Sequence, residues 1–199
     1  IKKPSGVILL FGQQPFTSML VVSQIKQFVY DWIWEKPKAT GHLNAKKQPM
    51  RSHETILVFG KGCYNPQKTS GVPYKPNGGK SKLDNYGDFA AIREGSPDGS
   101  RYPRSVLLMK HETSPVHPTQ KPVALMEYFI RTYSNEGDTV LDCFMGSGTT
   151  GAACVIENRH FIGIEKHTPY FDIAKKRINE LETPLISELP KTYKQTELA

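Results

Sequence analysis

The sequence predicts an α/β fold with a nucleotide-binding loop late in the chain, and three observations support this prediction. Gly6-Val-Ile-Leu-Leu-Phe-Gly12 is a short apolar run between glycines, which is typical of a buried parallel strand. The strand predicted at 139–143 leads into Gly146-Ser-Gly-Thr-Thr-Gly151, with glycines spaced G-x-G-x-x-G, and then into a helix predicted at 149–158. The strand predicted at 160–165 ends at Glu165, where the carboxylate of a β-α-β unit accepts hydrogen bonds from a ribose.

The composition fits one domain with an insertion. The chain has 199 residues, 38% of them hydrophobic, and a mean hydropathy of −0.46. The apolar runs are far too short to cross a bilayer, and no secretion signal is recognisable. A net charge of +7 favours a polyanionic partner. The cysteines Cys63, Cys143 and Cys154 lack metal-ligand spacing, so no metal is expected; we expect Cys143 and Cys154 to be buried in a cytosolic protein.

Residues 1–60 form the first of three parts. After the strand at 6–12, apolar spacing predicts a helix over 16–27, and aromatic and β-branched residues predict strands at 30–35 and 55–59. Trp32 and Trp34 alternate along the first of these strands, so both are expected in the core. Between Lys36 and Arg51 the chain has no acidic residue and five basic ones: Lys36, Lys38, Lys46, Lys47 and Arg51.

Residues 61–116 form the second part, which is rich in Gly, Pro, Asn, Lys and Ser and has no helical or alternating period. A loop of this length is either functional or a surface insertion without a role in binding. Aromatic residues are interleaved with its basic ones, as expected where rings stack on bases and cations contact phosphates. The aromatic residues are Tyr64, Tyr74, Tyr86, Phe89 and Tyr102.

Residues 117–185 form the third part, followed by a polar segment, 186–199, that we expect to be a mobile tail. Pro122 suits the first turn of a helix, with Thr119 or Gln120 before it as a cap. A last helix is predicted over 170–181. Taken without its context, the segment before Pro122 reads as a simple helix cap.

NAD and S-adenosylmethionine both fit a G-x-G-x-x-G loop, and two features favour the second. Only one helix and a tail follow Glu165, so the rest of the sheet must come from earlier sequence, unlike a typical NAD domain, which opens with its glycine loop. In addition, Asp142 at the strand end suits an ammonium group, which a methionine moiety has and a hydride carrier lacks, and Phe144 suits ring packing on the ligand.

Several ordered motifs resemble those of the DNA amino-methyltransferases, the family that methylates the exocyclic amine of adenine or cytosine. Asp142-Cys-Phe-Met-Gly-Ser-Gly-Thr-Thr150 resembles the family's cofactor loop, and His117-Pro-Thr-Gln-Lys-Pro122 resembles the segment that closes over the methionine end of the cofactor. Trp34-Glu-Lys-Pro37 and Arg51-Ser-His-Glu54 resemble segments that flank the target base. The order matches the permuted class, in which the catalytic half comes first, target recognition second and the cofactor half last.

This resemblance implies a Rossmann-like methyltransferase sheet with helices on both faces and a loop-rich target-recognition insertion at 61–116. It implies S-adenosylmethionine as cofactor and double-stranded DNA as partner, in the cytosol of a bacterial or phage-infected cell. The cofactor-binding residues it implies are His117, Thr119, Lys121, Pro122, Asp142, Phe144, Gly146, Ser147, Gly148, Thr149 and Glu165.

The resemblance also indicates Gln13, Phe16, His53 and Glu54 for the target-base pocket, although a strand-edge ion pair or hydrogen bond explains His53 and Glu54 equally well. The basic residues expected to contact DNA are Lys36, Lys38, Lys46, Lys47 and Arg51.

One expected motif is missing. The family aligns the target amine with Asp-Pro-Pro-Tyr, or with Asn or Ser in the first position, and this tetrapeptide does not occur in the chain. No catalytic residue is therefore identified, and we expect the chain to be the C-terminal portion of a longer methyltransferase, with adenine the favoured target. The alternative is a non-catalytic DNA-binding or regulatory module that retains the cofactor fold.

Overall fold

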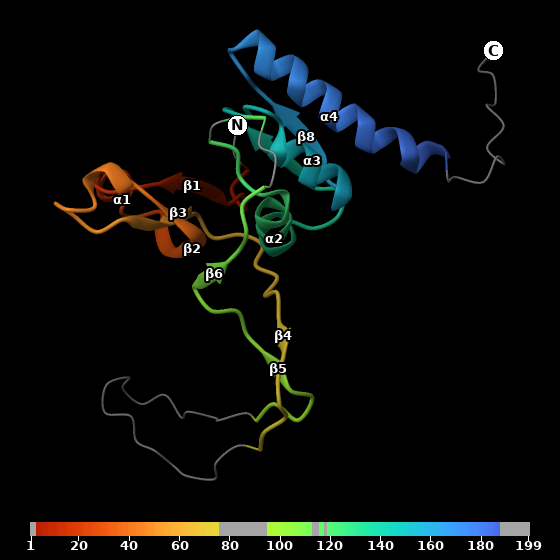
Figure 1. The fold of residues 1–199 in the computed structure, drawn as a ribbon. Coiled ribbons are helices and arrows are strands. Elements are labelled where there is room, and N and C mark those ends of the chain that lie inside the picture. The colour runs from red at the N-terminus through yellow and green to blue at the C-terminus, as the bar shows by residue number, and fades with distance from the viewer. Residues whose placement is uncertain (1–2, 76–94, 113–115, 118, 188–199) are drawn as a thin grey trace, which may run out of the picture. The chain divides into compact units, whose positions relative to one another are not determined.

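The computed structural model describes residues 3–75, 95–112, 116–117 and 119–187. Two compact units are present: unit 1 comprises Ile1–Asn65 with Ser105–Ala199, and unit 2 comprises Pro66–Arg104. Unit 1 contains, in chain order, β1 (Ile8–Gly12), α1 (Phe16–Ser23), β2 (Phe28–Thr40), the 3-10 helix η1 (His42–Asn44), β3 (Arg51–Phe59), β6 (Val106–Leu108), α2 (Val123–Tyr133), β7 (Thr139–Asp142), α3 (Thr149–Ile156), β8 (His160–Gly163) and α4 (Thr168–Ser187) (Figure 1). Unit 2 contains β4 (Thr69–Ser70) and β5 (Ser100–Arg101).

Unit 1 holds two sheets. The larger has the order β1-β3-β2-β6, in which β3 runs antiparallel to both neighbours and β6 runs parallel to β2. The smaller is the parallel pair β7-β8, in which Asp142 lies opposite Gly163. Within the described part of the chain, β1 pairs only with β3 and β7 only with β8, so each leaves one edge unpaired. The predicted α/β class is confirmed, with the strands in two sheets. The prediction of a buried parallel strand at 6–12 was wrong, because β1 runs antiparallel to β3 and its Ile8 and Leu10 are 38% and 37% exposed.

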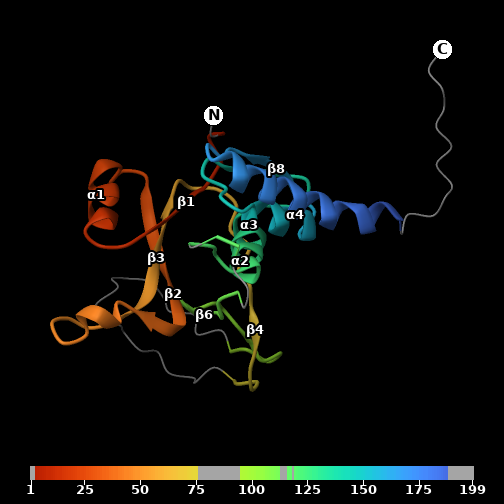
Figure 2. The same ribbon diagram turned by 45° about the horizontal axis from the view of Figure 1, so that its top comes forward.

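The main core lies between the larger sheet and α2. Trp32, Trp34, Ile56 and Val58 point from β2 and β3 toward Leu125 and Phe129 of α2, and all six side chains are buried. The two tryptophans are two positions apart in a strand, and Leu125 and Phe129 are four apart in a helix, so each pair faces one side. The core role expected for both tryptophans is confirmed. Figure 2 shows α1 on the opposite side of this sheet from α2.

A second core lies around α3, where Ile130 of α2 packs with Ala153 and Cys154. Small residues let α3 approach its neighbours closely. A Cβ added at Gly151 would lie 2.4 Å from Cδ1 of Ile178 and 2.7 Å from the Phe161 ring. This glycine therefore serves helix packing, which the G-x-G-x-x-G pattern requires of its third position.

Unit 2 is a short antiparallel pair with aromatic side chains beside basic ones. Lys68 lies over the Tyr102 ring at 4.5 Å, and Arg101 lies over the Tyr74 ring at 4.6 Å. The predicted insertion, 61–116, is longer than unit 2, because β6 joins the larger sheet beside β2. Tyr86 and Phe89 lie outside the described residues.

Several predicted boundaries shift. The first helix ends at Ser23, because Gln24 has φ −140° and the chain turns there instead of continuing to residue 27. β2 and β3 extend well beyond the predicted 30–35 and 55–59, since their outer ends pair through exposed polar residues that carry no apolar alternation. The last helix continues to Ser187. Cys154 is buried as predicted, whereas the prediction for Cys143 was wrong, because it is exposed where the chain leaves β7.

Candidate functional site

The glycine-rich loop connects β7 to α3 in a conformation that favours glycine. Gly146 and Gly148 have φ values of +54° and +77°, in the left-handed region that side chains disfavour. Gly148 also lies against α4, since a Cβ added there would be 2.7 Å from the Cβ of Ala174. The amide of Gly148 donates to the Met145 carbonyl at 2.8 Å, which closes the turn. The loop is therefore a tight backbone cradle at the carboxyl ends of β7 and β8, where α/β sheets bind ligands.

Asp142 is the last residue of β7, and both of its carboxylate oxygens are held. Oδ1 accepts the Phe144 amide at 3.0 Å, and Oδ2 accepts the Thr150 hydroxyl at 2.6 Å. The Phe144 ring is 90% exposed. The strand end thus presents a fixed anion beside an uncovered aromatic ring.

Glu165 follows β8 and faces the same loop. Its Oε1 accepts the His167 amide at 2.8 Å, and its Oε2 accepts the Gly146 amide at 2.9 Å. The backbone N–H of His167, together with that of Gly146, lowers the pKa of this carboxyl below its ordinary value. The ionised carboxylate retains lone pairs that can accept further hydroxyl groups.

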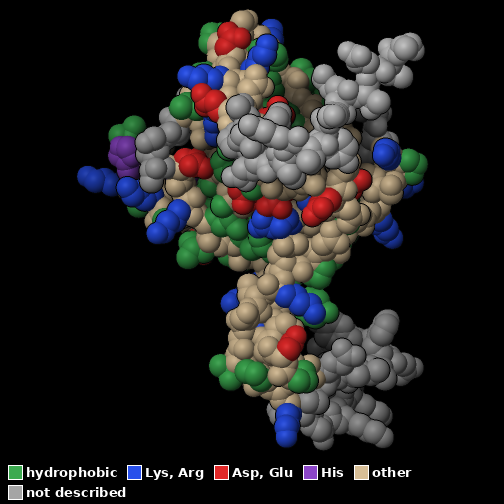
Figure 3. All heavy atoms as spheres, turned by 90° about the vertical axis from the view of Figure 1, so that its right-hand side faces the viewer, with side chains coloured by type: hydrophobic (Ala, Val, Ile, Leu, Met, Phe, Trp, Pro, Cys, Tyr) green, Lys and Arg blue, Asp and Glu red, His purple; other side chains and the backbone are tan. Residues whose placement is uncertain are grey.

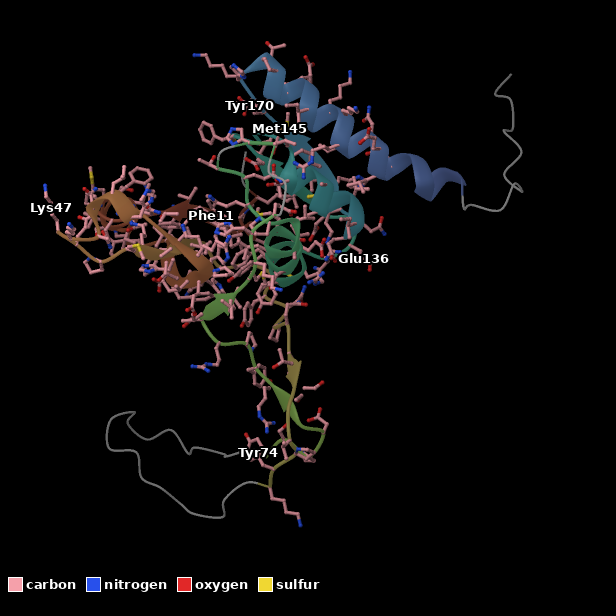
Figure 4. All side chains as sticks on the ribbon, viewed as in Figure 1. Phe11, Lys47, Tyr74, Glu136, Met145 and Tyr170 are labelled. Atoms are coloured by element: carbon pink, nitrogen blue, oxygen red, sulfur yellow. The ribbon has the colours of Figure 1, made fainter. Side chains whose placement is uncertain are left out.

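In the turn 117–122, of which the structure describes His117 and residues 119–122, two side chains lie against this loop. His117 is the side chain nearest to the position that a Cβ of Gly146 would occupy, at 3.7 Å from Nε2. The Ser147 hydroxyl donates to Oε1 of Gln120 at 3.1 Å. The His117 ring also packs edge-on against Tyr170, with centroids 4.2 Å apart. Figure 4 labels Met145 and Tyr170, which lie on this side of the protein near the start of α4.

The helix cap expected from Thr119 or Gln120 is not formed. Pro122 occupies the N-cap position of α2 without a side-chain cap, and the amide of Val123 instead donates to Oε1 of Glu112 at 2.9 Å. Because Glu112 satisfies the helix end, Gln120 is available to bridge Ser147 and the amide of Val116. The segment therefore contacts the glycine-rich loop instead of capping the helix.

Three predicted site residues meet at a different place. Lys121 Nζ lies 3.0 Å from Oε2 of Glu54, and Lys36 Nζ lies 3.2 Å from Oε1 of the same carboxylate. Of the two interpretations of Glu54 left open by the sequence, the structure contains an ion pair. Lys36 is only 6% exposed.

The other residues indicated for the base pocket lie at the carboxyl end of β1 and on β3. Arg51 donates to the side-chain oxygen of Gln13. Phe16, at the first turn of α1, is 56% exposed, and His53 is exposed on β3 opposite Glu35. Thr149 is buried at the first position of α3.

The basic segment around η1 is exposed apart from Lys36. Lys38, Lys46, Lys47 and Arg51 all have exposed side chains, and Figure 4 shows Lys47 pointing away from the protein at the end of the β2–β3 hairpin. On the face drawn in Figure 3, by contrast, acidic side chains are interspersed among basic ones.

Sequence reasoning did not identify three residues that hold the loop: Gln120, Thr150 and Arg177. Arg177 of α4 donates to the Ser147 carbonyl at 2.6 Å and to its hydroxyl at 3.1 Å. Thr150 lies within the motif Gly146–Gly151, so its position in the sequence could have indicated a role in holding the loop. Arg177 is 30 residues from Ser147 and carries no local signal. Among the described residues, no group of three or more His, Cys, Asp or Glu is arranged to hold a metal ion.

Fold and site together define an α/β protein with a nucleotide cradle at the end of its parallel strands. A DNA methylase family model matches residues 1–176, and the chain belongs to this family of N6/N4 DNA methylases. The predicted family is therefore confirmed.

Relatives and solved structures agree with this assignment. The type II methyltransferase M.HpaI of Haemophilus parainfluenzae is 31% identical over 189 residues, which cover 90% of this chain and 55% of the relative. The DNA adenine methyltransferase YhdJ of Escherichia coli is 42% identical over 94 residues, which cover 47% of this chain and 31% of YhdJ. The structure of the M1.HpyAVI complex with S-adenosylmethionine has a TM-score of 0.61 and 31% identity, covering 89% of this chain and 76% of that one.

The cytosine-N4-specific PvuII DNA methyltransferase shares the fold, with a TM-score of 0.63 at 17% identity over 93% of this chain and 71% of that one. The match covers 55% of M.HpaI, so the chain spans about half the length of this relative. No helix in the described ranges is both long enough and apolar enough to span a membrane.

Proposed function

We propose that the chain binds S-adenosylmethionine and forms the cofactor- and DNA-binding portion of a methyltransferase acting on the exocyclic amine of a flipped base, with adenine the favoured target. The observation that carries this proposal is the convergence of two distant segments. The turn 117–122 and the loop after β7 touch through Gln120 and Ser147, and Asp142 and Glu165 flank the same loop.

The residues present fit this cofactor. Glu165 would accept the ribose hydroxyls, because its carboxylate is ionised and is held by two backbone amides. Asp142 would face the ammonium of the methionine moiety, and the exposed Phe144 ring would pack on the ligand. When bound, the cofactor supplies a methyl group on an electrophilic sulfonium. The role of the turn 117–122 is to orient the ligand in the cradle.

Double-stranded DNA is the proposed partner, in the cytosol of a bacterial or phage-infected cell. Lys38, Lys46, Lys47 and Arg51 would contact phosphates, since they are exposed and no acidic residue lies among them. Gln13, Phe16 and His53, near the carboxyl end of β1, would line the base pocket. Unit 2, with its paired cations and rings, would contribute to target recognition.

The strand that carries the family's amine-aligning tetrapeptide is proposed to belong to polypeptide outside this chain. Two features support this. The described strands β1 and β7 each have an unpaired edge, and one face of the β7-β8 pair is uncovered: Leu141, Ile162 and Ile164 are 39%, 54% and 54% exposed. Parallel sheets are normally covered on both faces. Methylation by this chain alone is therefore expected to be weak or absent.

Calorimetric titration with S-adenosylmethionine and with NAD tests the cofactor assignment. The chain should bind the first ligand and not the second. Glu165→Gln should weaken binding by about 10-fold or more, since two hydrogen bonds to an ionised acceptor are weakened. The matched control is Glu136→Gln, at an exposed glutamate before β7 that Figure 4 labels. Binding of NAD, binding of neither ligand, or an unaffected Glu165→Gln variant would contradict the proposal.

A further inference from the structure

A single carboxylate joins β2, β3 and the turn before α2. The carboxylate of Glu54, on β3, forms two ion pairs. Its Oε1 lies 3.2 Å from Nζ of Lys36 on β2, and its Oε2 lies 3.0 Å from Nζ of Lys121 in the turn. Their side chains are 16%, 5% and 23% exposed, respectively. Each oxygen of the carboxylate therefore already has a cationic partner.

Two aromatic rings flank this cluster. The Trp34 ring faces both ammonium groups, at 5.8 Å from Lys36 and 5.9 Å from Lys121, and the Phe11 ring lies 5.5 Å from Lys121. Trp34 is itself fixed, because its indole N–H donates to the Met109 carbonyl at 3.0 Å. Rings on these sides keep water and salt away from the ion pairs, so the pairs are screened less than surface pairs.

Glu54 is ionised in this setting. Its burial raises the pKa, but the hydrogen bonds and charges of Lys121 and Lys36 outweigh this effect and hold the pKa below its ordinary value. A buried pair of this kind adds little net stability compared with an apolar replacement, but losing one partner is costly. Its better-attested effect is to fix one arrangement of the elements it connects.

The far side of the same turn contacts the glycine-rich loop. Gln120, next to Lys121, accepts the Ser147 hydroxyl, and His117 lies over Gly146. Within the turn, Lys121 Nζ also reaches the Thr119 carbonyl at 3.4 Å, and the Gln120 amide donates to the His117 carbonyl at 3.1 Å. The described residues of the turn are thus bonded to one another, with Lys121 attached to the larger sheet and with His117 and Gln120 against the loop.

We propose that Glu54 is a positioning residue for the cofactor: by holding Lys121, it fixes the turn 117–122 over the glycine-rich loop and so acts on cofactor affinity without touching the ligand. The inference rests on the proposed binding of S-adenosylmethionine. Lys36 has a different role, since it anchors the Glu54 carboxylate from β2.

Calorimetry with S-adenosylmethionine on five variants tests this role, together with the Tm of each unliganded protein. Glu54→Gln and Lys121→Met should each weaken binding by about 10-fold, the order expected when a charge-assisted hydrogen bond that holds the turn is lost. The double variant should bind no more weakly than either single one, because both remove the same link. Lys121→Arg should restore affinity to within about 2-fold of wild type, since it keeps the cation.

Lys36→Met separates positioning from stability. It should lower the Tm at least as much as Lys121→Met, because Lys36 is the more buried cation, but it should weaken cofactor binding less. If Lys36→Met weakens binding as much as Glu54→Gln, or if the two single effects add, Glu54 is only structural and the proposal fails. If Glu54→Gln does not fold, the proposal is tested by the cofactor affinities of Lys121→Met and Lys121→Arg, and equal affinities of these two variants would contradict it. Wild-type protein that does not bind the cofactor would overturn the proposed function itself, whereas normal binding that Glu54→Gln and Lys121→Met leave unchanged would overturn only this inference.

Discussion

The hydroxyl of Ser147 donates a 3.1 Å hydrogen bond to Oε1 of Gln120, and this bond joins the turn before α2 to the loop between β7 and α3. The same serine is held from the other side by Arg177, which donates to its carbonyl at 2.6 Å. Ser147 is 3% exposed, so these bonds are largely shielded from water. The loop therefore has a defined shape set by residues from two other segments.

Gln120→Ala removes the bond from the turn to the loop. We expect it to weaken binding of S-adenosylmethionine by about 5-fold, because a net hydrogen-bond contribution of about 1 kcal/mol corresponds to that factor. Titration calorimetry measures this change. Gln48→Ala, at an exposed glutamine in the hairpin, is the control and should bind as wild type. Unchanged affinity in Gln120→Ala would mean that the turn does not act on the cofactor through this contact.

Glu165 should give the protein a measurable acid sensitivity. Its pKa lies below the ordinary value of 4.5, mainly because the His167 amide donates to it. A lowered carboxyl pKa stabilises the folded state above the ordinary value, and this stabilisation is lost as the pH falls through the folded-state pKa. Glu165→Gln should therefore lower the Tm at pH 7 and flatten the decline of the Tm below pH 4.5. The measurement is the Tm as a function of pH, with Glu136→Gln as control; parallel curves for wild type and Glu165→Gln would contradict it.

Substitutions at two glycines with the same backbone conformation distinguish the cost of backbone strain from the cost of steric crowding. Gly148 and Gly137 both have φ +77°, but only Gly148 faces Ala174, whereas a Cβ at Gly137 would meet nothing within 4 Å. Gly137→Ala should cost about 1 kcal/mol of unfolding free energy from backbone strain alone. Gly148→Ala should cost about 2–4 kcal/mol, because the new methyl group also forces α4 away from the loop. Urea denaturation of both variants measures the difference, and equal losses would show that α4 yields freely.

Much of the cofactor half followed from local patterns in the sequence. The strand–loop–helix–strand series around Gly146 and the acid at Glu165 were predicted, since each element has its own apolar period and the glycines mark positions that need a positive φ. The contacts among these elements were not predicted. Arg177 and Glu112 act over distances in sequence that no local period reports.

The basic segment shows where composition alone is insufficient. Lys36 and Lys38 are two positions apart in β2, so strand alternation places both on the face of Trp34 and does not separate them. Lys36 is buried because Glu54 satisfies its charge there, whereas Lys38 is exposed beyond Glu35, where the β2–β3 register shifts. The partner, Glu54, belongs to another strand, so the burial of Lys36 depends on the β2–β3 register that places Trp34 opposite Glu54. Likewise, β6 has only three residues and was hidden in a segment without a period.

The exposed lysines at the end of the β2–β3 hairpin should govern the salt dependence of DNA binding. Lys46 and Lys47 follow η1 with exposed side chains. If each contacts one phosphate, the double variant Lys46→Ala/Lys47→Ala should reduce the slope of log K against log salt concentration by about 1.8, since one phosphate contact contributes about 0.9.

The affinity loss should be similar for unrelated duplex sequences, because phosphate contacts position the protein without reading bases. Lys175→Ala/Lys176→Ala on α4 removes the same charge and is the matched control. Fluorescence anisotropy on a labelled duplex over a range of salt concentrations measures both slopes. Equal slope changes in the two double variants would show that net charge acts alone, and the hairpin would then have no specific place in the DNA interface.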